Sequence, residues 1–365
     1  MFGELVAAYL FLAGTGAGGI AAASLVDLLV VRAPCGAASA ASVADTSPAE
    51  RLVAYASATS ASALVAGAAC LIADVGRADR VLALFFTPGF TFMNVGAWAL
   101  TALITVGAAL ALVRFLYLPW VGRAAVAVLE VAAVALAFVV AVYAGLLLQG
   151  LAGVRLWSSG WVPVLFVLSA ASCGCALVAG CALFVEADGR TVALGRAILR
   201  SDAVVVGAEA LAGALFLAGA AGSDHPGVAA SVERLLHGSA ALPWWCGFVL
   251  CGLAAPLAIE AAFWLRERRR GSGAIGSGGA RSLREVDVPA AFSAPAFAVP
   301  PVALVALAAL VLAGGAGLRW AVVEAGEQRP LELQEVEADG SAHAANPAGG
   351  YTEDGEREEP SLWLS

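Results

Sequence analysis

Long apolar stretches, separated by short polar segments, dominate the chain. Each stretch has 20 or more residues, and a helix of that length crosses the roughly 30 Å hydrocarbon core of a bilayer at about 1.5 Å per residue. The pattern predicts transmembrane helices at about residues 4–31, 51–73, 89–116, 123–148, 161–187, 202–222, 240–265 and 296–322.

The apolar stretches are too long and too continuous for the strands of a membrane barrel, which need only about 9–11 residues and alternate in polarity. Composition agrees, because 61% of the 365 residues are hydrophobic and only 13% are charged. The predicted fold is therefore an all-α integral membrane protein, a bundle of eight transmembrane helices.

Every basic residue is an arginine, and arginines concentrate on one side of the predicted membrane. The segments after the first, third, fifth and seventh helices carry 13 arginines, against 7 on the other side. Because cytoplasmic loops are enriched in basic residues, both termini are expected outside the cytoplasm. The N-terminus lacks the basic region of a signal peptide, so the first helix is expected to be retained.

Two polar segments lie outside this pattern. Residues 266–294 begin with arginines and continue rich in glycine and serine, which predicts a flexible linker. Residues 327–365 form an acidic tail that is expected to be disordered. The formal charge of −8 and the lack of a basic patch outside one loop argue against a nucleic-acid partner.

Polar and aromatic residues recur at the predicted extracytoplasmic ends of the first four helices and in the loop after the fourth. A flat ligand with two oxygens, such as a quinone, suits such a rim, and so does an ordinary membrane interface, where tryptophan and tyrosine are enriched. The candidate quinone-binding residues are Glu4, Tyr9, Asp74, Arg77, Asn94, Trp98, Tyr143, Gln149, Arg155 and Trp157.

A second set of acids is predicted deeper in the bundle or toward the cytoplasm. Asp27 and Glu260 belong to it, together with the candidate proton path formed by Glu130, Asp202 and Glu209. Ionisable side chains inside a membrane are functional candidates. The alternative is that Glu130 and Glu209 are neutral acids that hydrogen-bond to neighbouring helices.

The chain offers few ligands for metals. The three histidines lie outside the predicted helices, so haem coordinated within the bundle is excluded, and no CxxC pair suggests a metal site or an iron–sulfur cluster. Gly14 and Gly18 lie four residues apart inside the first helix, where glycines favour close helix packing over phosphate binding.

Several short motifs, in order and at consistent spacing over residues 4–328, resemble the NrfD/polysulfide-reductase membrane subunit family. They include the glycine-rich segment after Tyr9, and the turn Asp74-Val-Gly-Arg-Ala-Asp-Arg80, where the family has D-L-G-R-P-E-R. They continue with Asn94-Val-Gly-Ala-Trp98, Tyr143-Ala-Gly-Leu-Leu-Leu148 with Leu156-Trp157, the acids Asp202 and Glu209, and Gly314-Gly-Ala-Gly-Leu-Arg-Trp320.

This resemblance implies a multi-pass subunit of a respiratory complex in a prokaryotic cytoplasmic membrane. The implied ligand is menaquinone or menaquinol, near Tyr143, Asp74 and the start of the first helix. The implied partners are a four-cluster ferredoxin-like iron–sulfur subunit and a molybdopterin catalytic subunit, docked on the extracytoplasmic side. Two alternatives remain: a proton-translocating subunit and, from another class, a secondary transporter.

Overall fold

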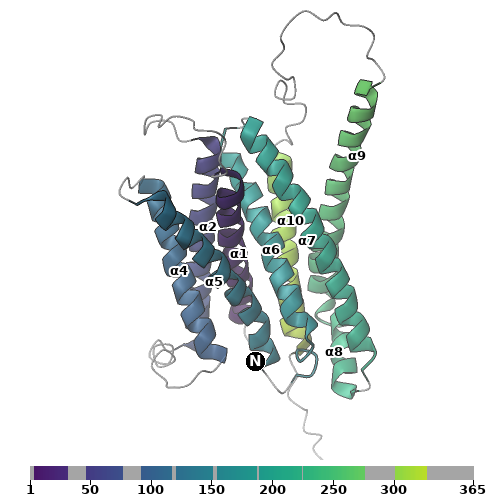
Figure 1. Cartoon of the computed structure of the whole chain (residues 1–365). Coiled ribbons are helices and arrows are strands. Elements are labelled where there is room, and N and C mark those ends of the chain that lie inside the picture. Colours follow the sequence, from purple (N-terminus) through teal and green to yellow (C-terminus); the bar gives the residue numbers. More distant parts are fainter. Residues whose placement is uncertain are drawn as a thin grey trace, which may run out of the picture. The chain divides into compact units, whose positions relative to one another are not determined.

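The computed structural model describes residues 4–31, 47–76, 92–116, 121–150, 154–186, 189–223, 225–275 and 301–326. Within these residues every regular element is a helix (Figure 1). The helices are α1 (Glu4–Val26), α2 (Pro48–Val75), α4 (Phe92–Leu116), α5 (Arg123–Gln149), α6 (Trp161–Cys181), α7 (Gly189–Ala221), α8 (Pro226–His237), α9 (Ala255–Ile275) and α10 (Pro301–Gly326).

Three short segments extend these helices with a different winding. The π-helical η1 (Asp27–Val31) follows α1, the 3₁₀ turn η2 (Ala182–Phe184) follows α6, and the π-helical η3 (Pro243–Ala254) leads into α9. π-Helical turns are rare and often mark functional sites.

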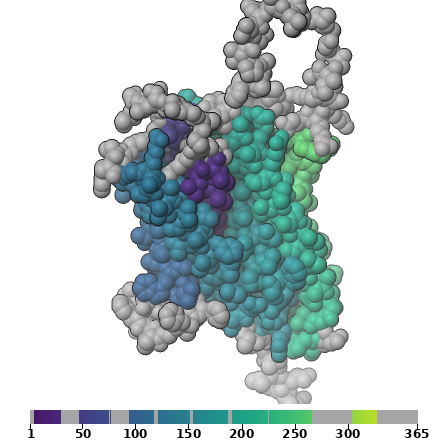
Figure 2. All heavy atoms as spheres, viewed as in Figure 1, coloured from purple at the N-terminus to yellow at the C-terminus, as the bar shows by residue number. Residues whose placement is uncertain are grey.

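Eight of the described helical segments are long and apolar enough to cross a membrane, so the predicted all-α multi-pass fold is confirmed. Successive spans run up and down, which brings the start of α1 and the end of α10 to the same end of the bundle (Figure 1). Large apolar side chains such as Val128, Phe138 and Val204 are exposed, as a lipid-facing surface requires. Helices α5 and α7 supply much of the face shown in Figure 2.

The structure differs from the sequence pattern in three places. The sixth span begins near Thr191, about three turns before the predicted start, because α7 continues beyond the apolar run into an arginine-containing segment. Helix α8 lies in what was predicted to be a loop. The predicted linker at 266–294 is wrong for residues 266–275, which continue α9. The remainder of that linker and the acidic tail lie outside the described residues.

Local sequence signals fix both ends of α2. Ser47 accepts a hydrogen bond from the Glu50 amide, and the Glu50 carboxylate accepts one from the Ser47 amide, which forms a capping box. The helix ends at Gly76, whose φ of 67° is left-handed and therefore suits glycine. Helix α2 thus ends at the glycine of the Asp74–Arg80 motif.

Helix α1 lies at the centre of the packing and contacts α2, α5, α6 and α10. Its glycines permit this, as the sequence predicted. A Cβ at Gly18 would overlap the backbone carbonyl of Ala170 in α6, and one at Gly16 would lie 2.8 Å from the Ser60 carbonyl oxygen of α2. A similar approach joins η3 to α10, where Gly247 faces Gly317. Van der Waals contact between backbones holds these helices together in lipid.

The Gly18→Ala variant is expected to lower the free energy of unfolding by about 1–3 kcal/mol, because α1 and α6 must separate to admit the methyl group. Gly207→Ala is the matched control, since a Cβ at Gly207 meets no atom within 4 Å. That variant is expected to be neutral or stabilising by up to about 1 kcal/mol, from helix propensity. Unfolding of the two purified variants in mixed micelles measures the difference, and equal stabilities would contradict the packing described here.

Candidate functional site

Two buried tyrosines face each other at the end of the bundle where α1 begins. Tyr9 of α1 and Tyr143 of α5 are both buried, and their side chains lie within hydrogen-bonding range of one another. Gly96 of α4 completes the arrangement, because a Cβ at that position would overlap the Tyr143 ring. Three helices therefore enclose a pair of phenol hydroxyls, each able to donate and to accept a hydrogen bond. We call Tyr9 and Tyr143 the tyrosine pair.

Two other predicted rim residues hold the loop between α5 and α6 in place. The Trp157 indole N–H donates to the Val322 carbonyl of α10 at 2.8 Å, and the ring lies where a Gly326 side chain would otherwise be. Gln149 donates from Nε2 to the Ser158 carbonyl at 3.2 Å. Gln149 thus links the end of α5 to Ser158, and the Trp157 indole links the segment before α6 to α10.

The remaining predicted rim residues differ in exposure. Asn94 is buried, whereas Trp98 is 58% exposed on the surface of α4. Glu4, Asp74 and Arg155 are exposed, and Arg77 lies outside the described residues. The structure therefore brings Tyr9 and Tyr143 together and shows no contact that joins Glu4, Asp74 or Arg155 to them.

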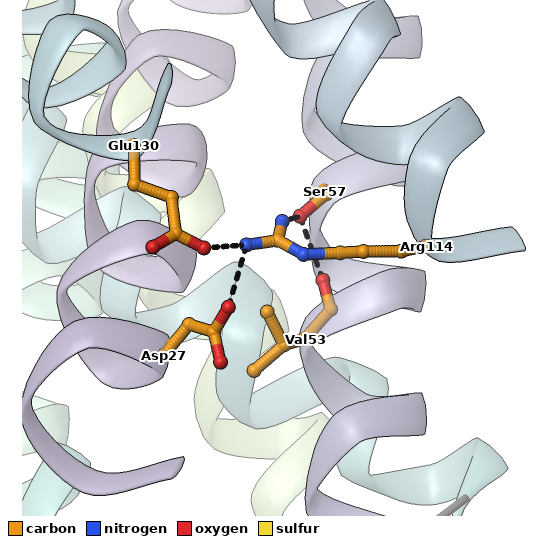
Figure 3. A network of polar contacts seen from close by, with 5 residues as sticks. All are labelled: Asp27, Val53, Ser57, Arg114 and Glu130. Atoms are coloured by element: carbon orange, nitrogen blue, oxygen red, sulfur yellow. Dashed lines mark hydrogen bonds and ion pairs between the residues drawn. The ribbon is translucent and has the colours of Figure 1, made fainter. Parts of the chain in front are cut away.

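A buried ion cluster occupies the opposite end of the bundle (Figure 3). Arg114 of α4 donates from one nitrogen to the Asp27 carboxylate at 3.2 Å and to the Glu130 carboxylate at 2.5 Å. Its other terminal nitrogen donates to the Ser57 hydroxyl, which donates in turn to the Val53 carbonyl at 2.7 Å. This Arg114 cluster ties η1, α2, α4 and α5 together.

The charges of the Arg114 cluster explain its geometry. Glu130 is fully buried, and the side chains of Arg114 and Asp27 are only 11% and 10% exposed. A lone ion at such a position would be strongly unfavourable, and here one guanidinium hydrogen-bonds two carboxylates and offsets part of their charge. Glu130 is therefore held by an arginine, which favours a structural role for this member of the predicted proton path.

A second buried arginine lies closer to the tyrosine pair. Arg319 of α10 donates from Nε to the Leu10 carbonyl of α1 at 3.0 Å, and its guanidinium stacks 5.4 Å from the centre of the Phe166 ring. Another nitrogen donates to the Ser169 hydroxyl at 3.0 Å and to the Gly315 carbonyl at 2.8 Å. The Arg319 guanidinium occupies space that is free because Gly14 of α1 has no side chain. A Cβ at Gly14 would lie 2.5 Å from an Arg319 nitrogen.

The acids of α7 lie on the same side of the bundle as Arg319. Glu209 is near enough to Arg319 for their charges to attract and lies within hydrogen-bonding range of Ser169. Asp202, two turns earlier on α7, lies near Ser172 of α6 and Glu260 of α9. The predicted set of Glu130, Asp202 and Glu209 thus divides between two separate groups of helices.

Sequence reasoning assigned Arg114 and Arg319 to the loops and flanks that set orientation, although both are central to buried clusters. Each lies near the end of an apolar run, where an arginine usually extends its charge to the interface. For Arg319 a signal was present, because Gly314 and Gly315 precede it by about one turn and leave room for a large side chain.

An apolar groove of about 590 Å³ runs between α2 and the second half of α4. Alanines form most of it, with Val65, Leu112 and Phe115. Its one hydroxyl, on Ser62, donates to the Ala58 carbonyl at 2.8 Å. With no polar group free to orient a ring, the groove suits a hydrocarbon chain of membrane lipid.

Comparison with known proteins gives one result. The family model described as polysulphide reductase, NrfD, matches residues 1–276 of the 365. That region holds α1 to α9, and so includes the tyrosine pair, the Arg114 cluster and the acids of α7 and α9, whereas α10 with Arg319 lies beyond it. No curated protein matches the chain.

Arg114→Gln is expected to destabilise the protein by about 3–5 kcal/mol, because it leaves Asp27 and Glu130 buried without their counter-ion. The double variant Arg114→Gln with Glu130→Gln is expected to recover part of that loss, since one of the two acids is then neutral. Unfolding of the purified variants measures both. Arg155→Gln, which changes an exposed arginine, serves as the control, and an Arg114→Gln protein as stable as this control would contradict a buried ion cluster.

Proposed function

The chain belongs to the polysulphide reductase NrfD family of membrane proteins, and from this premise we propose that it is the quinone-binding membrane subunit of a respiratory oxidoreductase complex. The bound species is menaquinone or menaquinol. The complex lies in a prokaryotic cytoplasmic membrane, with both termini of this chain outside the cytoplasm. The arginine asymmetry of 13 against 7 supports that orientation.

The tyrosine pair is the observation that carries the proposal. A quinone presents two carbonyl oxygens on a flat apolar ring, and a binding site for it needs a few hydrogen-bonding groups within apolar walls. Tyr9 and Tyr143 supply two hydroxyls, in a part of the bundle whose neighbouring core residues are apolar. Tyr143 and Tyr9 would bind the ring oxygens, with Asn94 and Trp98 of the adjoining α4 as further candidates.

In this proposal, residues of this chain accept and release the protons of the bound quinol. Menaquinol, when bound, supplies two electrons and two protons. The tyrosine hydroxyls accept and donate hydrogen bonds and can pass a proton between them. Asp74 and Glu4 are exposed carboxylates at the ends of α2 and α1, where a proton can be released to water. Arg155 is exposed in the segment before α6 and adds positive charge in this proposal. Arg77, the other predicted arginine, lies outside the described residues.

Electron exchange in this proposal takes place with a partner protein. As the family resemblance implies, we assign it to an iron–sulfur subunit of the four-cluster ferredoxin type, linked to a molybdopterin catalytic subunit. Both would dock at the end of the bundle where α1 begins. Affinity purification of the full chain from its native membrane, followed by iron and molybdenum analysis, tests this assignment.

Tyr143→Phe is expected to weaken binding of a short-chain menaquinone analogue by about 2–10-fold, which corresponds to the 0.5–1.5 kcal/mol of one hydrogen bond. Titration calorimetry of the full chain in detergent measures the affinity. Tyr55→Phe is the matched control, because Tyr55 packs on Phe115 and Phe184 away from the tyrosine pair. Equal affinities of the Tyr143→Phe and Tyr55→Phe proteins for the analogue would show that it does not bind at the tyrosine pair.

A further inference from the structure

We propose that the apolar groove between α2 and α4 binds an acyl chain of an anionic phospholipid, whose phosphate lies at Arg51 in the first turn of α2. This lipid site lies toward the end of the bundle that holds the Arg114 cluster, because Ser57 and Val53 of that cluster belong to the same part of α2. It requires only that the chain spans a membrane, and it is independent of the tyrosine pair.

The groove has the length and the exposure of a seat for one hydrocarbon chain. Its α2 wall runs from Ala58 to Ala69, and that distance is about 16 Å along a helix. One leaflet of the hydrocarbon core is about 15 Å thick, half of the roughly 30 Å of a bilayer. Ala66 of α2 and Ala108 and Leu112 of α4 are exposed, so the groove opens to the lipid-facing surface of the protein.

The volume of the groove favours an acyl chain over a helix of another protein. A helix about 10 Å wide fills about 1,250 Å³ over a length of 16 Å, which is roughly twice the groove volume of about 590 Å³. A helix would therefore remain largely outside the groove, whereas a hydrocarbon chain is narrow enough to lie within it. The alanines that line the groove leave this space because each side chain is a single methyl group.

The face of α2 that forms the groove ends in a positive charge. Arg51 precedes Ala58 by two helical turns and Val65 by four, so the three residues lie along one line of the helix. Arg51 is exposed and lies about 10 Å along the axis from the first groove residue. The neighbouring Glu50 carboxylate is bound to the Ser47 amide in the capping box, and the start of a helix is itself favourable for an anion.

An aromatic pair lies between Arg51 and the groove. Tyr55, one turn after Arg51, packs against Phe115 of the groove edge to edge, with ring centroids 5.9 Å apart and an interplanar angle of 66°. Tyrosine is enriched at the level of the lipid headgroups. Along α2, an arginine, a tyrosine and an apolar groove thus follow one another in the order of the phosphate, ester and acyl chain of a phospholipid. Because a surface arginine attracts net negative charge, the site favours an anionic lipid over a zwitterionic one.

Native mass spectrometry tests the headgroup. The full chain is released from micelles that contain equal amounts of phosphatidylglycerol and phosphatidylcholine with the same acyl chains, and the wild-type protein is expected to retain mainly the anionic lipid. Arg51→Gln is expected to lower this preference about fivefold. Arg196→Gln is the matched control and is expected to keep it, because Arg196 is exposed on α7 opposite Leu194 and Ile198, which are buried. An unchanged preference in Arg51→Gln overturns the site, and so does a wild-type protein that retains no lipid.

Filling the groove tests the acyl chain in the same measurement. Ala66→Leu and Ala108→Leu enlarge exposed residues on its two walls, so each is expected to fold normally and to lose the retained lipid, whichever headgroup it carries. Ala135→Leu, at an exposed alanine of α5 outside the groove, is the control and is expected to retain the lipid. Retention of the lipid by both groove variants overturns the site. A wild-type complex of two copies that Ala66→Leu separates also overturns it, because the occupant is then a helix of a second copy.

Discussion

The structure depends on the close approach that the glycines of α1 allow. Where two helices meet through glycine, their backbones touch, and van der Waals contact supplies in lipid what the hydrophobic effect supplies in water. Gly18 brings α6 against α1 in this way, and Gly16 does the same for α2. Gly14 has a different partner, because the guanidinium of Arg319 fills the space that a side chain would take. The same stripe of small residues thus fixes the packing and admits a buried charge.

Charge compensation then separates the polar interior into two parts. At one end of the bundle, Arg114 of α4 pairs with acids from η1 and α5 and also contacts α2. Along α7, the acids outnumber the cations, since Arg319 is the only described basic group that acts on Glu209 and none pairs with Asp202 or Glu260. In both parts the acids outnumber the arginines, so the difference between them lies in geometry. Arg114 contacts both of its acids, whereas the structure shows no salt bridge to Asp202 or Glu260 among its described residues.

The eight spans were predictable because length and hydropathy are one-dimensional properties, and a run of 20 apolar residues has few alternatives to a membrane helix. Depth was predictable in the same way, so Glu130, Asp202 and Glu209 were expected inside the membrane. The direction in which each side chain points around its helix could not be predicted, because every face of these helices is apolar. Nothing in the sequence separates Glu130, which faces Arg114, from Asp202, which faces α6 and α9.

At the rim of the bundle, too, the sequence does not predict the direction of aromatic side chains. Tyr143 lies near the end of α5 and Trp157 lies in the segment before α6, and both are aromatic residues of the kind expected at a membrane interface. In the structure, Tyr143 turns to Tyr9 and Gly96, whereas the Trp157 indole is committed to the Val322 carbonyl. Tyr9 and Tyr143 are 134 positions apart in the chain. Their contact depends on which helices pack against α1, and short sequence motifs do not predict that packing.

Helix α1 contributes to both the tyrosine pair and the Arg319 site through adjacent residues. The Tyr9 side chain belongs to the tyrosine pair, and the Leu10 carbonyl accepts the hydrogen bond of Arg319. The first of these groups is a side chain and the second is a backbone carbonyl, so one helix presents a hydroxyl to α5 and a carbonyl to α10 from consecutive residues. The close approach at Gly14 leaves the space in which the Arg319 guanidinium reaches the Leu10 carbonyl. The packing that fixes α1 therefore also places a buried cation against the residue that follows Tyr9.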